Sequence, residues 1–324
     1  MAQERGDGPR LQPRGPEPPD GRLQACRGMV AGQGGEQAAR RMRHAGTVTS
    51  ARGPGQPRYS PAVRYELQDG RILTWSLETH VATHCNLRCV QCCPLSPHLP
   101  AWAVEPAALG EDLRRLAKAL RPQVFKLTGG EPFLHPDLPA VLDVVRASGI
   151  SSQVSITTNG FLAQSAPDAV YERLDRMTLS VYTSAPLPER SIARITERCE
   201  QHGVYLTVKR IDAFQQLTPE APHATDEAVR GVHARCWLKV RCHLVHAGRF
   251  YACTRPPHVA TVLSREHPDM PALSEVDGVP LDTPDLLGPL LGYLERETPL
   301  ATCRYCLGGD GAWLPHAQLP RSRS

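Results

Sequence analysis

The 324-residue sequence lacks any run that approaches about 18 consecutive apolar residues, the minimum expected of a membrane-spanning helix. Its opening segment, MAQERGDGPRLQPRGPEPPDG, also lacks the apolar stretch of a secretory signal peptide. We therefore expect no membrane span and a cytoplasmic location. Apolar residues still make up 41% of the sequence, which is enough for a sizeable buried core.

Most of the chain also carries little net charge. The total is +4, and residues 1–60 carry +5 because they contain ten Arg, no Lys and five acidic residues, which leaves −1 for the rest. A nearly neutral folded part argues against a nucleic-acid partner. Residues 1–60 contain eleven Gly and seven Pro without apolar periodicity, so we expect a disordered tail there.

Beyond this tail, short apolar segments alternate with helical patterns. Strands are predicted at residues 71–83, 123–127, 153–157, 177–182 and 204–211, and helices at 106–120, 136–147, 167–174 and 188–201. Such alternation is typical of βα units on a parallel sheet. Five strands are too few for a closed eight-unit barrel. The sequence therefore predicts a partial barrel or an open α/β sheet.

Cysteine, in contrast, is abundant. The chain has eleven cysteines, and without a secretory signal they favour metal or redox chemistry over disulfides. Cys85, Cys89 and Cys92 form a C-x3-C-x2-C group directly after the first predicted strand. Three thiolates can hold a metal centre with one open position, whereas a structural zinc or an electron-transfer iron–sulfur cluster takes four protein ligands. A zinc knuckle with a distant fourth ligand is the alternative.

Two further motifs follow the next strands. Residues 128–132 read TGGEP after the second predicted strand, and residues 157–160 read TTNG at the end of the third. In this order, together with the cysteines, they resemble the radical S-adenosylmethionine (SAM) superfamily. The resemblance covers residues 75–210 and implies a partial (β/α) barrel of radical SAM type. It also implies that the three cysteines hold a 4Fe–4S cluster whose open iron binds SAM.

The resemblance further assigns contacts to SAM. Glycines at positions 129 and 130 let the backbone approach the methionine part, because no Cβ intervenes, and Glu131 accepts a hydrogen bond from the SAM ammonium. The implied SAM-binding residues are Gly129, Gly130, Glu131, Asn159, Ser180 and Lys209, with Arg210 as a further candidate. The residue before the third cysteine is usually aromatic in this family and packs near adenine. Here it is Gln91, so the adenine contact must differ.

A second cysteine group lies further along the chain and consists of Cys236, Cys253, Cys303 and Cys306. Its spacing, with Gly248 before Cys253, resembles the C-terminal extension called SPASM, in the short form called Twitch. That resemblance implies a second 4Fe–4S cluster with four thiolate ligands. A zinc ribbon with four cysteines is the alternative.

Cys242 is an alternative to Cys236 as one of these four ligands. Residues 236–253 predict a β-hairpin with a two-residue turn at 247 and 248. That register would place Cys242 opposite Cys253 on one face, whereas the family spacing favours Cys236. We predict Cys236 as the ligand and Cys242 as a nearby thiol. Cys93 is an extra thiol beside the first group.

These patterns divide the chain into four parts. We expect the disordered tail at 1–60, the partial barrel at 61–225, a small Twitch-like iron–sulfur module at 226–315 and a frayed tail at 316–324. Residues 255–302 are rich in proline and are predicted to be irregular.

The resemblance implies an oxidoreductase. The first cluster would cleave SAM reductively to a 5'-deoxyadenosyl radical, which takes a hydrogen atom from the substrate, and the second cluster would accept an electron. We expect a small-molecule substrate of sugar or cyclitol type from secondary metabolism, and a flavodoxin or ferredoxin as electron donor. Three alternatives stay open: a peptide-modifying radical SAM enzyme, a radical epimerase with Cys93 or Cys242 as hydrogen donor, and a zinc-stabilised binding protein.

Overall fold

The computed structural model describes residues 64–266 and 273–320, which all belong to one unit of the chain, Arg52–Ser324. The tail expected at residues 1–60 lies outside the described residues. Within the described ranges, no helix is long and apolar enough to cross a membrane.

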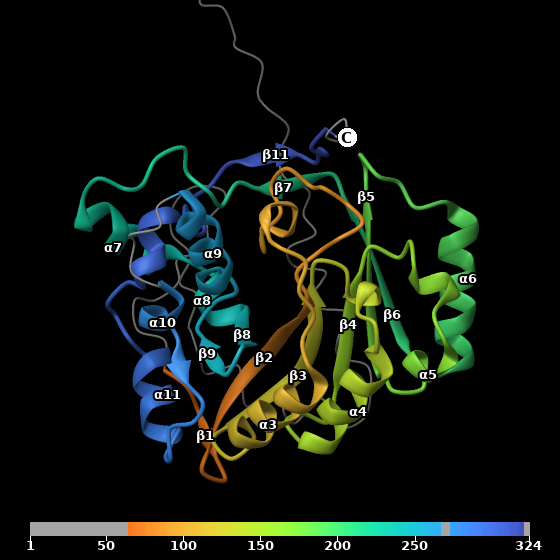
Figure 1. The fold of residues 1–324 in the computed structure, drawn as a ribbon, viewed down its shortest axis with the longest axis horizontal. Helices are drawn as coiled ribbons and strands as arrows, with labels where there is room; N and C mark the ends of the chain where they lie inside the picture. Colours follow the sequence, from red (N-terminus) through yellow and green to blue (C-terminus); the bar gives the residue numbers. More distant parts are fainter. Residues whose placement is uncertain (1–63, 267–272, 321–324) are drawn as a thin grey trace, which may run out of the picture. The chain divides into compact units, whose positions relative to one another are not determined.

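A nine-stranded sheet organises the described residues (Figure 1). Its strand order is β10-β9-β8-β2-β3-β4-β5-β6, with β1 (Leu67–Gln68) attached to β2. Neighbouring strands are parallel from β2 to β6. These strands are β2 (Arg71–Ala82), β3 (Leu120–Gly129), β4 (Val154–Thr158), β5 (Arg176–Tyr182) and β6 (Tyr205–Ile211). The predicted α/β fold with a parallel sheet is confirmed.

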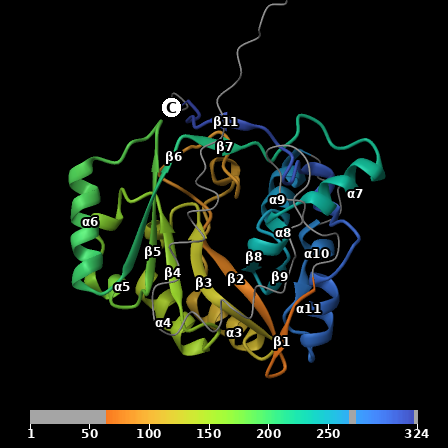
Figure 2. The ribbon, with the colours of Figure 1, turned by 180° about the vertical axis from the view of Figure 1, so that it is seen from behind.

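Helices connect the parallel strands and lie outside the sheet in both views (Figures 1 and 2). They are α3 (Pro106–Leu116), α4 (Leu138–Ser148), α5 (Asp168–Tyr171) and α6 (Glu189–Gln201). Their apolar sides bury Leu113, Leu142 and Ile195 in the same core as the strand residues Phe125 and Leu179. The apolar side chains that recur every 3.6 residues on the helices therefore pack against those that recur every two residues on the strands, and together they form one apolar layer.

Side chains close in sequence determine where α4 begins and ends. The Asp137 carboxylate accepts a hydrogen bond from the Ala140 N–H at 3.1 Å, which satisfies a free donor in the first turn. Gly149 ends the helix in the left-handed conformation, at φ 65°. Both ends of this helix are therefore determined by residues within or next to it.

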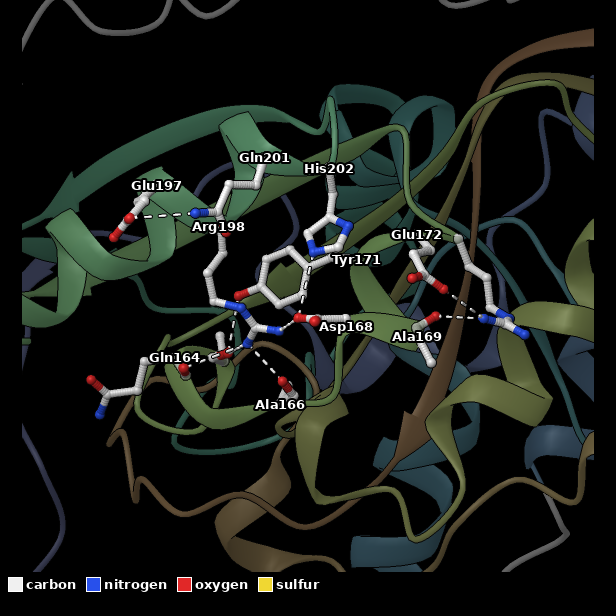
Figure 3. A network of polar contacts seen from close by, with 12 residues as sticks. Gln164, Ala166, Asp168, Ala169, Tyr171, Glu172, Glu197, Arg198, Gln201 and His202 are labelled. Atoms are coloured by element: carbon white, nitrogen blue, oxygen red, sulfur yellow. Dashed lines mark hydrogen bonds and ion pairs between the residues drawn. The ribbon is translucent and has the colours of Figure 1, made fainter.

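A polar network fastens α6 to the segment around α5 (Figure 3). Arg198 donates to the backbone oxygen of Ala166 at 2.6 Å and pairs with Asp168. The Arg198 guanidinium also lies 4.2 Å from the ring centroid of Tyr171, and His202 lies 3.4 Å from Asp168. These contacts join helices on the outside of the sheet, so we assign them to the fold.

The opposite face of the parallel sheet is polar. Buried apolar residues recur at alternate positions on β2, β3, β4 and β5, as Phe125 and Leu127 do on β3, so the residues between them point away from the helices. On β2 and β3, Glu78 and Lys126 are cross-strand neighbours on this inner face, one position after the buried Leu77 and Phe125. On β5 and β6 the corresponding pair is Ser180 and Lys209. A polar inner surface thus crosses the sheet.

The sheet continues beyond β2 through the predicted hairpin. β8 (His243–His246) pairs in parallel with β2 and antiparallel with β9 (Arg249–Tyr251). Ala247 and Gly248 connect the two strands, and both have positive φ, 47° and 74°. Such a two-residue turn matches the twist of a hairpin, and it confirms the predicted turn.

The described residues in the range 255–302 are largely helical, so the prediction of an irregular segment is wrong for them. They form α9 (Pro256–Glu266), α10 (Leu273–Asp277) and α11 (Leu287–Leu294), with the short strand β10 (Val279–Pro280) between the last two. Pro256 and Pro257 suggested a break, but they occupy the first turn of α9, where a backbone N–H has no partner within the helix. Leu290 and Leu294 bury α11 in the main core.

A second, two-stranded sheet brings the last described segment back to the parallel strands. β7 (Ala213–Gln215) pairs antiparallel with β11 (Trp313–Pro315). Between them the chain also forms α7 (Asp226–Arg235) and α8 (Leu238–Arg241). The sequence predicted a frayed tail from residue 316, whereas residues 316, 317 and 319 make backbone hydrogen bonds to residues 212, 90 and 88.

Candidate cofactor site

The first cysteine group lies in the loop that follows β2. The Cys92 N–H donates to the Cys89 oxygen at 3.3 Å, and the Leu95 N–H donates to the Cys92 oxygen at 3.0 Å. Cys89 is buried, and Cys85 and Cys92 are half-buried. The loop therefore presents three thiols at the carboxyl edge of the parallel sheet, where α/β folds build their sites.

Two glycines bring the end of β3 against this loop. The Gly130 N–H donates to the Ala82 oxygen at 2.8 Å, and the Glu131 N–H donates to the His84 oxygen at 3.0 Å. A Cβ at Gly129 would lie 2.3 Å from the Ala82 oxygen, and one at Gly130 would lie 2.0 Å from the His84 oxygen. The sequence predicted that these glycines admit SAM. In the structure they let two backbone segments meet.

Glu131 joins the TGGEP and TTNG motifs. Its fully buried carboxylate accepts hydrogen bonds from the Thr158 hydroxyl at 2.7 Å and from the N–H groups of Asn159 at 2.9 Å and Phe133 at 3.2 Å. Burial raises the pKa of Glu131, and these donors oppose the rise. A carboxylate has about four acceptor sites, so one remains for another donor. Its contact with the SAM ammonium stays a prediction.

Asn159 links the TTNG motif to the cysteine loop. Its Nδ2 donates to Asn86 Oδ1 at 2.6 Å and lies 3.7 Å from Cys85 Sγ. The Leu87 N–H donates to the same sulfur at 3.4 Å. The three motifs that the sequence analysis singled out therefore meet at one edge of the sheet.

The remaining predicted SAM contacts differ in exposure. Ser180 is 5% exposed on the inner face of β5. Lys209 and Arg210 are exposed on β6, and Arg210 pairs with Glu189 of α6 at 2.9 Å. Arg210 thus faces the outer helices. Ser180 is the better placed candidate, since it is buried at the same end of the sheet as the cysteines.

Tyr182 is a site residue that the sequence analysis missed. It lies two residues beyond Ser180 on the same face of β5. Burial raises the pKa of Tyr182, a hydrogen bond with Ser180 lowers it, and the Cys89, Cys92 and Cys85 thiols raise it further. The tyrosine therefore lies at the same end of the parallel sheet as the cysteine loop. Strand alternation from Ser180 is the pattern that could have identified it.

The second cysteine group forms a separate cluster. Cys236, Cys253 and Cys306 are buried and belong to one hydrophobic cluster, and the half-buried Cys303 packs against it. Burial and then the neighbouring thiols of the group raise the pKa of Cys236 to about 11 and that of Cys303 to about 12. Four thiols from separate segments thus share one apolar environment.

Cys242 packs against the same cluster, but the titratable side chains that most affect its pKa are not those that most affect the pKa of Cys236. The hairpin register would place it opposite Cys253 if the strand pairing continued, yet Cys242 ends α8 instead. Burial raises the pKa of Cys242, and Glu78 and Cys93 are the next largest causes. This position favours Cys236 as the fourth ligand, and that assignment stays a prediction.

Among the residues that the structure describes, no three His, Cys, Asp or Glu side chains are arranged to hold a single metal ion. An iron–sulfur cluster does not need such an arrangement, because each thiolate binds a different iron. The two groups of thiols, one of three and one of four, therefore define the candidate sites.

Comparison with known proteins assigns the part of the chain that carries the first group. The family model described as Radical SAM superfamily matches residues 80–219. The chain contains a radical SAM domain.

Curated proteins similar to this radical SAM domain are named GTP 3',8-cyclase. The one from Chlorobaculum tepidum is 31% identical over 139 residues, which cover 43% of this chain and 41% of that protein. The one from Streptomyces coelicolor is 33% identical over 131 residues, which cover 39% and 38%. The chain thus spans less than half the length of these curated relatives.

A crystal structure titled BtrN in complex with AdoMet and 2-DOIA aligns at 16% identity and a TM-score of 0.47, covering 74% of this chain and 95% of that one.

The residues of the radical SAM domain fit the cofactors that the family implies, which are SAM and a 4Fe–4S cluster. Cys85, Cys89 and Cys92 supply three thiols on one loop, which suits a cluster with one open iron. The remaining acceptor site of Glu131 suits the ammonium of SAM.

A buried charged network on the inner face of the radical SAM domain was also missed. Glu78 lies 3.8 Å from Nε2 of His80, and that nitrogen is 2.9 Å from the Thr254 hydroxyl. The other ring nitrogen of His80 is hydrogen-bonded to His258. Burial raises the pKa of Glu78, but His80, Lys126 and Thr254 together lower it below its usual value. His80 and Lys126 thus favour the charged form of the Glu78 carboxyl group. A Glu inside an otherwise buried strand was the available sequence clue.

Cys93 and Arg255 connect the network of Glu78, His80 and Thr254 with the two cysteine groups. Arg255 Nη1 donates to the Cys93 backbone oxygen at 2.8 Å. Burial raises the pKa of the Cys93 thiol to about 12, Arg255 lowers it, and Cys92, Glu78 and Cys306 raise it. Cys93 thus has neighbours in the first group, in the second group and in the charged network.

Replacing Glu131 with alanine is expected to weaken SAM binding about ten- to a hundredfold, because it removes one charge-assisted hydrogen bond worth about 1.5–3 kcal/mol. The iron content should not change, since Glu131 is not a thiol ligand. Equilibrium dialysis of labelled SAM against the reconstituted protein measures the dissociation constant.

The same change also leaves the donors of Thr158 and Asn159 without their acceptor, so thermal stability is followed in parallel. Glu131→Gln keeps the side-chain size and removes the charge, and it should also weaken SAM binding. Glu200→Ala, at an exposed position on α6, is the control. Equal dissociation constants in wild type and both Glu131 variants would refute the assigned role.

Proposed function

We propose that the protein is a radical SAM oxidoreductase that oxidises a small molecule of sugar or cyclitol type. The second cysteine group supports this most strongly, because its four thiols form a cluster separate from the first group. Four thiolates fully ligate a 4Fe–4S cluster and leave no iron open for SAM, which suits electron transfer. The proposed ligands of the second cluster are Cys236, Cys253, Cys303 and Cys306.

The proposed arrangement assigns a role to each part of the chain. We assign the SAM-binding partial barrel to residues 61–225 and a Twitch-like module around the second cluster to residues 226–315. Cys93 follows Cys92 of the first group in the sequence and packs against the cluster of the second group, which supports a substrate position between the two groups. A flavodoxin or ferredoxin is the proposed electron donor.

The chain's own residues must handle the charge that oxidation releases. When bound, SAM and the two clusters supply a radical that removes a hydrogen atom from a substrate carbon and an acceptor for one further electron. The proton of the substrate hydroxyl then needs an acceptor in the protein. Glu78 is buried beside His80 and Lys126, and we assign this role to it.

Glu78→Gln is expected to slow formation of the oxidised product about a hundred- to ten-thousandfold, the usual contribution of a positioned acid or base. SAM cleavage by the reduced protein should persist, because the first cysteine group is unchanged. Chromatography of 5'-deoxyadenosine and of product measures both. Glu66→Gln, at an exposed position, is the matched control. Product formation at the wild-type rate in Glu78→Gln would rule out the proton-acceptor role.

A substrate panel tests the function as a whole. The dithionite-reduced protein is incubated with SAM and, separately, with cyclitols, amino sugars, short peptides and GTP. GTP is included because the curated relatives are named GTP 3',8-cyclase. Substrate-dependent 5'-deoxyadenosine together with a product two hydrogens lighter is expected with a cyclitol or sugar. Turnover with GTP or a peptide alone would replace the proposal with a cyclase or a peptide-modifying enzyme.

A further inference from the structure

The last described segment of the chain crosses the first cysteine loop. The Val90 N–H donates to the Ala317 oxygen at 2.9 Å, and the Leu319 N–H donates to the Arg88 oxygen at 2.7 Å. Gln318 lies between these two bonds and pairs with Cys89 as an antiparallel bridge. The segment therefore adds a short strand-like edge to the loop that carries the thiols.

Gln318 is oriented by its own contacts. Its Oε1 accepts a hydrogen bond from the Arg88 N–H at 2.7 Å. Because a backbone N–H can only donate, the amide oxygen must face Arg88, and the amide nitrogen must face the other way. That nitrogen, Nε2, lies 3.3 Å from Cys89 Sγ. Gln318 thus donates to the sulfur of a proposed cluster ligand.

His316 anchors the segment at its other end. Its N–H donates to the Asp212 oxygen at 2.7 Å, and its ring stacks on Tyr182 with centroids 4.6 Å apart and planes 11° apart. His316 Nδ1 lies 2.8 Å from the Ser184 hydroxyl. Phe214 meets the same ring edge-on at 4.7 Å. These contacts tie the segment to the ends of β5 and β6, next to the cysteine loop.

The pairing of β7 with β11 holds the segment from the N-terminal side. Gly311 passes so close to this pair that a Cβ there would lie 1.7 Å from the Gln216 oxygen. Both views place β7 and β11 across the same end of the parallel strands (Figures 1 and 2). The position of Gln318 is therefore determined by contacts on both sides of it.

We propose that Gln318 is a positioning residue of the SAM-binding cluster, and that its hydrogen bond to the Cys89 thiolate raises the reduction potential of that cluster. This inference rests on the proposed 4Fe–4S cluster at Cys85, Cys89 and Cys92. Reduction adds negative charge to the cluster and its thiolates, and a hydrogen-bond donor at a thiolate sulfur stabilises that charge. Gln318 thereby makes reduction, the step that precedes SAM cleavage, easier.

The test is a redox titration of the holoenzyme that is followed by electron paramagnetic resonance. The signal that changes on adding SAM identifies the SAM-binding cluster, and its intensity against the applied potential gives the midpoint potential of that cluster. Gln318→Leu is expected to disfavour reduction about tenfold, which is about 59 mV toward negative potential for one electron. Gln318→Glu keeps an acceptor for the Arg88 N–H but removes the donor, and it should shift the potential in the same direction. Gln201→Leu, at an exposed position on α6, should leave the potential unchanged.

The outcomes separate this inference from the proposed function. A wild-type protein without a SAM-responsive cluster would contradict the proposed function itself. A normal wild-type cluster with an unchanged potential in both Gln318 variants would overturn only the role of Gln318. If Gln318→Leu does not retain the cluster, the potential of Gln318→Glu is the deciding measurement. An unchanged potential in Gln318→Glu would mean that Gln318 has only a structural role, and it would overturn the inference.

Discussion

Replacing both Cys303 and Cys306 with alanine should abolish the oxidised product, while 5'-deoxyadenosine still forms under dithionite. The reason is that the two changes remove two of the four thiols of the second group and leave the first group intact. The substrate radical then has no acceptor for its electron. Chromatography of both products, with iron analysis of the variant, measures the separation of SAM cleavage from oxidation.

The structure indicates that this double variant keeps its local fold. Cys303 lies in the short helix Ala301–Tyr305. The buried carboxylate of Asp277 accepts hydrogen bonds from the N–H groups of Ala301 and Thr302, each at 2.7 Å. These bonds hold the start of the helix without the thiols. Circular dichroism checks this, because loss of a metal site can unfold a small module.

Two results of this experiment would change the account. Full oxidised product from a folded double variant with one cluster would show that the second cluster is not the electron acceptor. An epimerase would instead incorporate deuterium from the solvent, and its product would disappear in Cys93→Ala or Cys242→Ala. Cys199→Ala, a buried cysteine on α6, is the matched control and should behave as wild type.

Replacing Cys85, Cys89 and Cys92 together with alanine should lower the iron content from about eight atoms per chain to about four. The same variant should make no 5'-deoxyadenosine, because the SAM-binding cluster is absent. Anaerobic reconstitution followed by iron and sulfide analysis gives the count. Stoichiometric zinc without iron uptake in the wild-type protein would support two structural zinc sites and contradict the account.

The parts of the fold that the sequence predicted are those that local patterns encode. Short apolar segments that alternate with helical patterns identified the five parallel strands, and the cysteine, TGGEP and TTNG motifs come at the ends of the first three. Parallel strands end at the same edge of a sheet, so the meeting of Asn159 with the loop of Cys85 followed from the order of the motifs.

The parts that the sequence did not predict depend on contacts between distant segments. Nothing near Gln318 in the sequence indicates that it meets Cys89, because the pairing of β7 with β11 brings it there. Glu78 looked like one charge in an apolar strand until β3 placed Lys126 beside it. The prolines of α9 were misleading for a different reason, since a proline disrupts a helix only beyond the first turn.

Glycine at positions 129 and 130 can be required for more than one physical reason. The resemblance to the radical SAM superfamily implies that these glycines let the backbone approach SAM. The structure shows that a side chain at either position would collide with the backbone of Ala82 or His84. A loss of SAM binding on their replacement would therefore report a displaced cysteine loop as well as a lost contact.

Electron paramagnetic resonance of the reduced wild-type protein, with and without SAM, tests the central claim most directly. The account predicts two 4Fe–4S signals, of which only one changes when SAM is added. That signal should be absent after replacement of Cys85, Cys89 and Cys92, and the other should be absent after replacement of Cys303 and Cys306. A single iron–sulfur signal, or a change of both signals on adding SAM, would contradict one open and one fully ligated cluster.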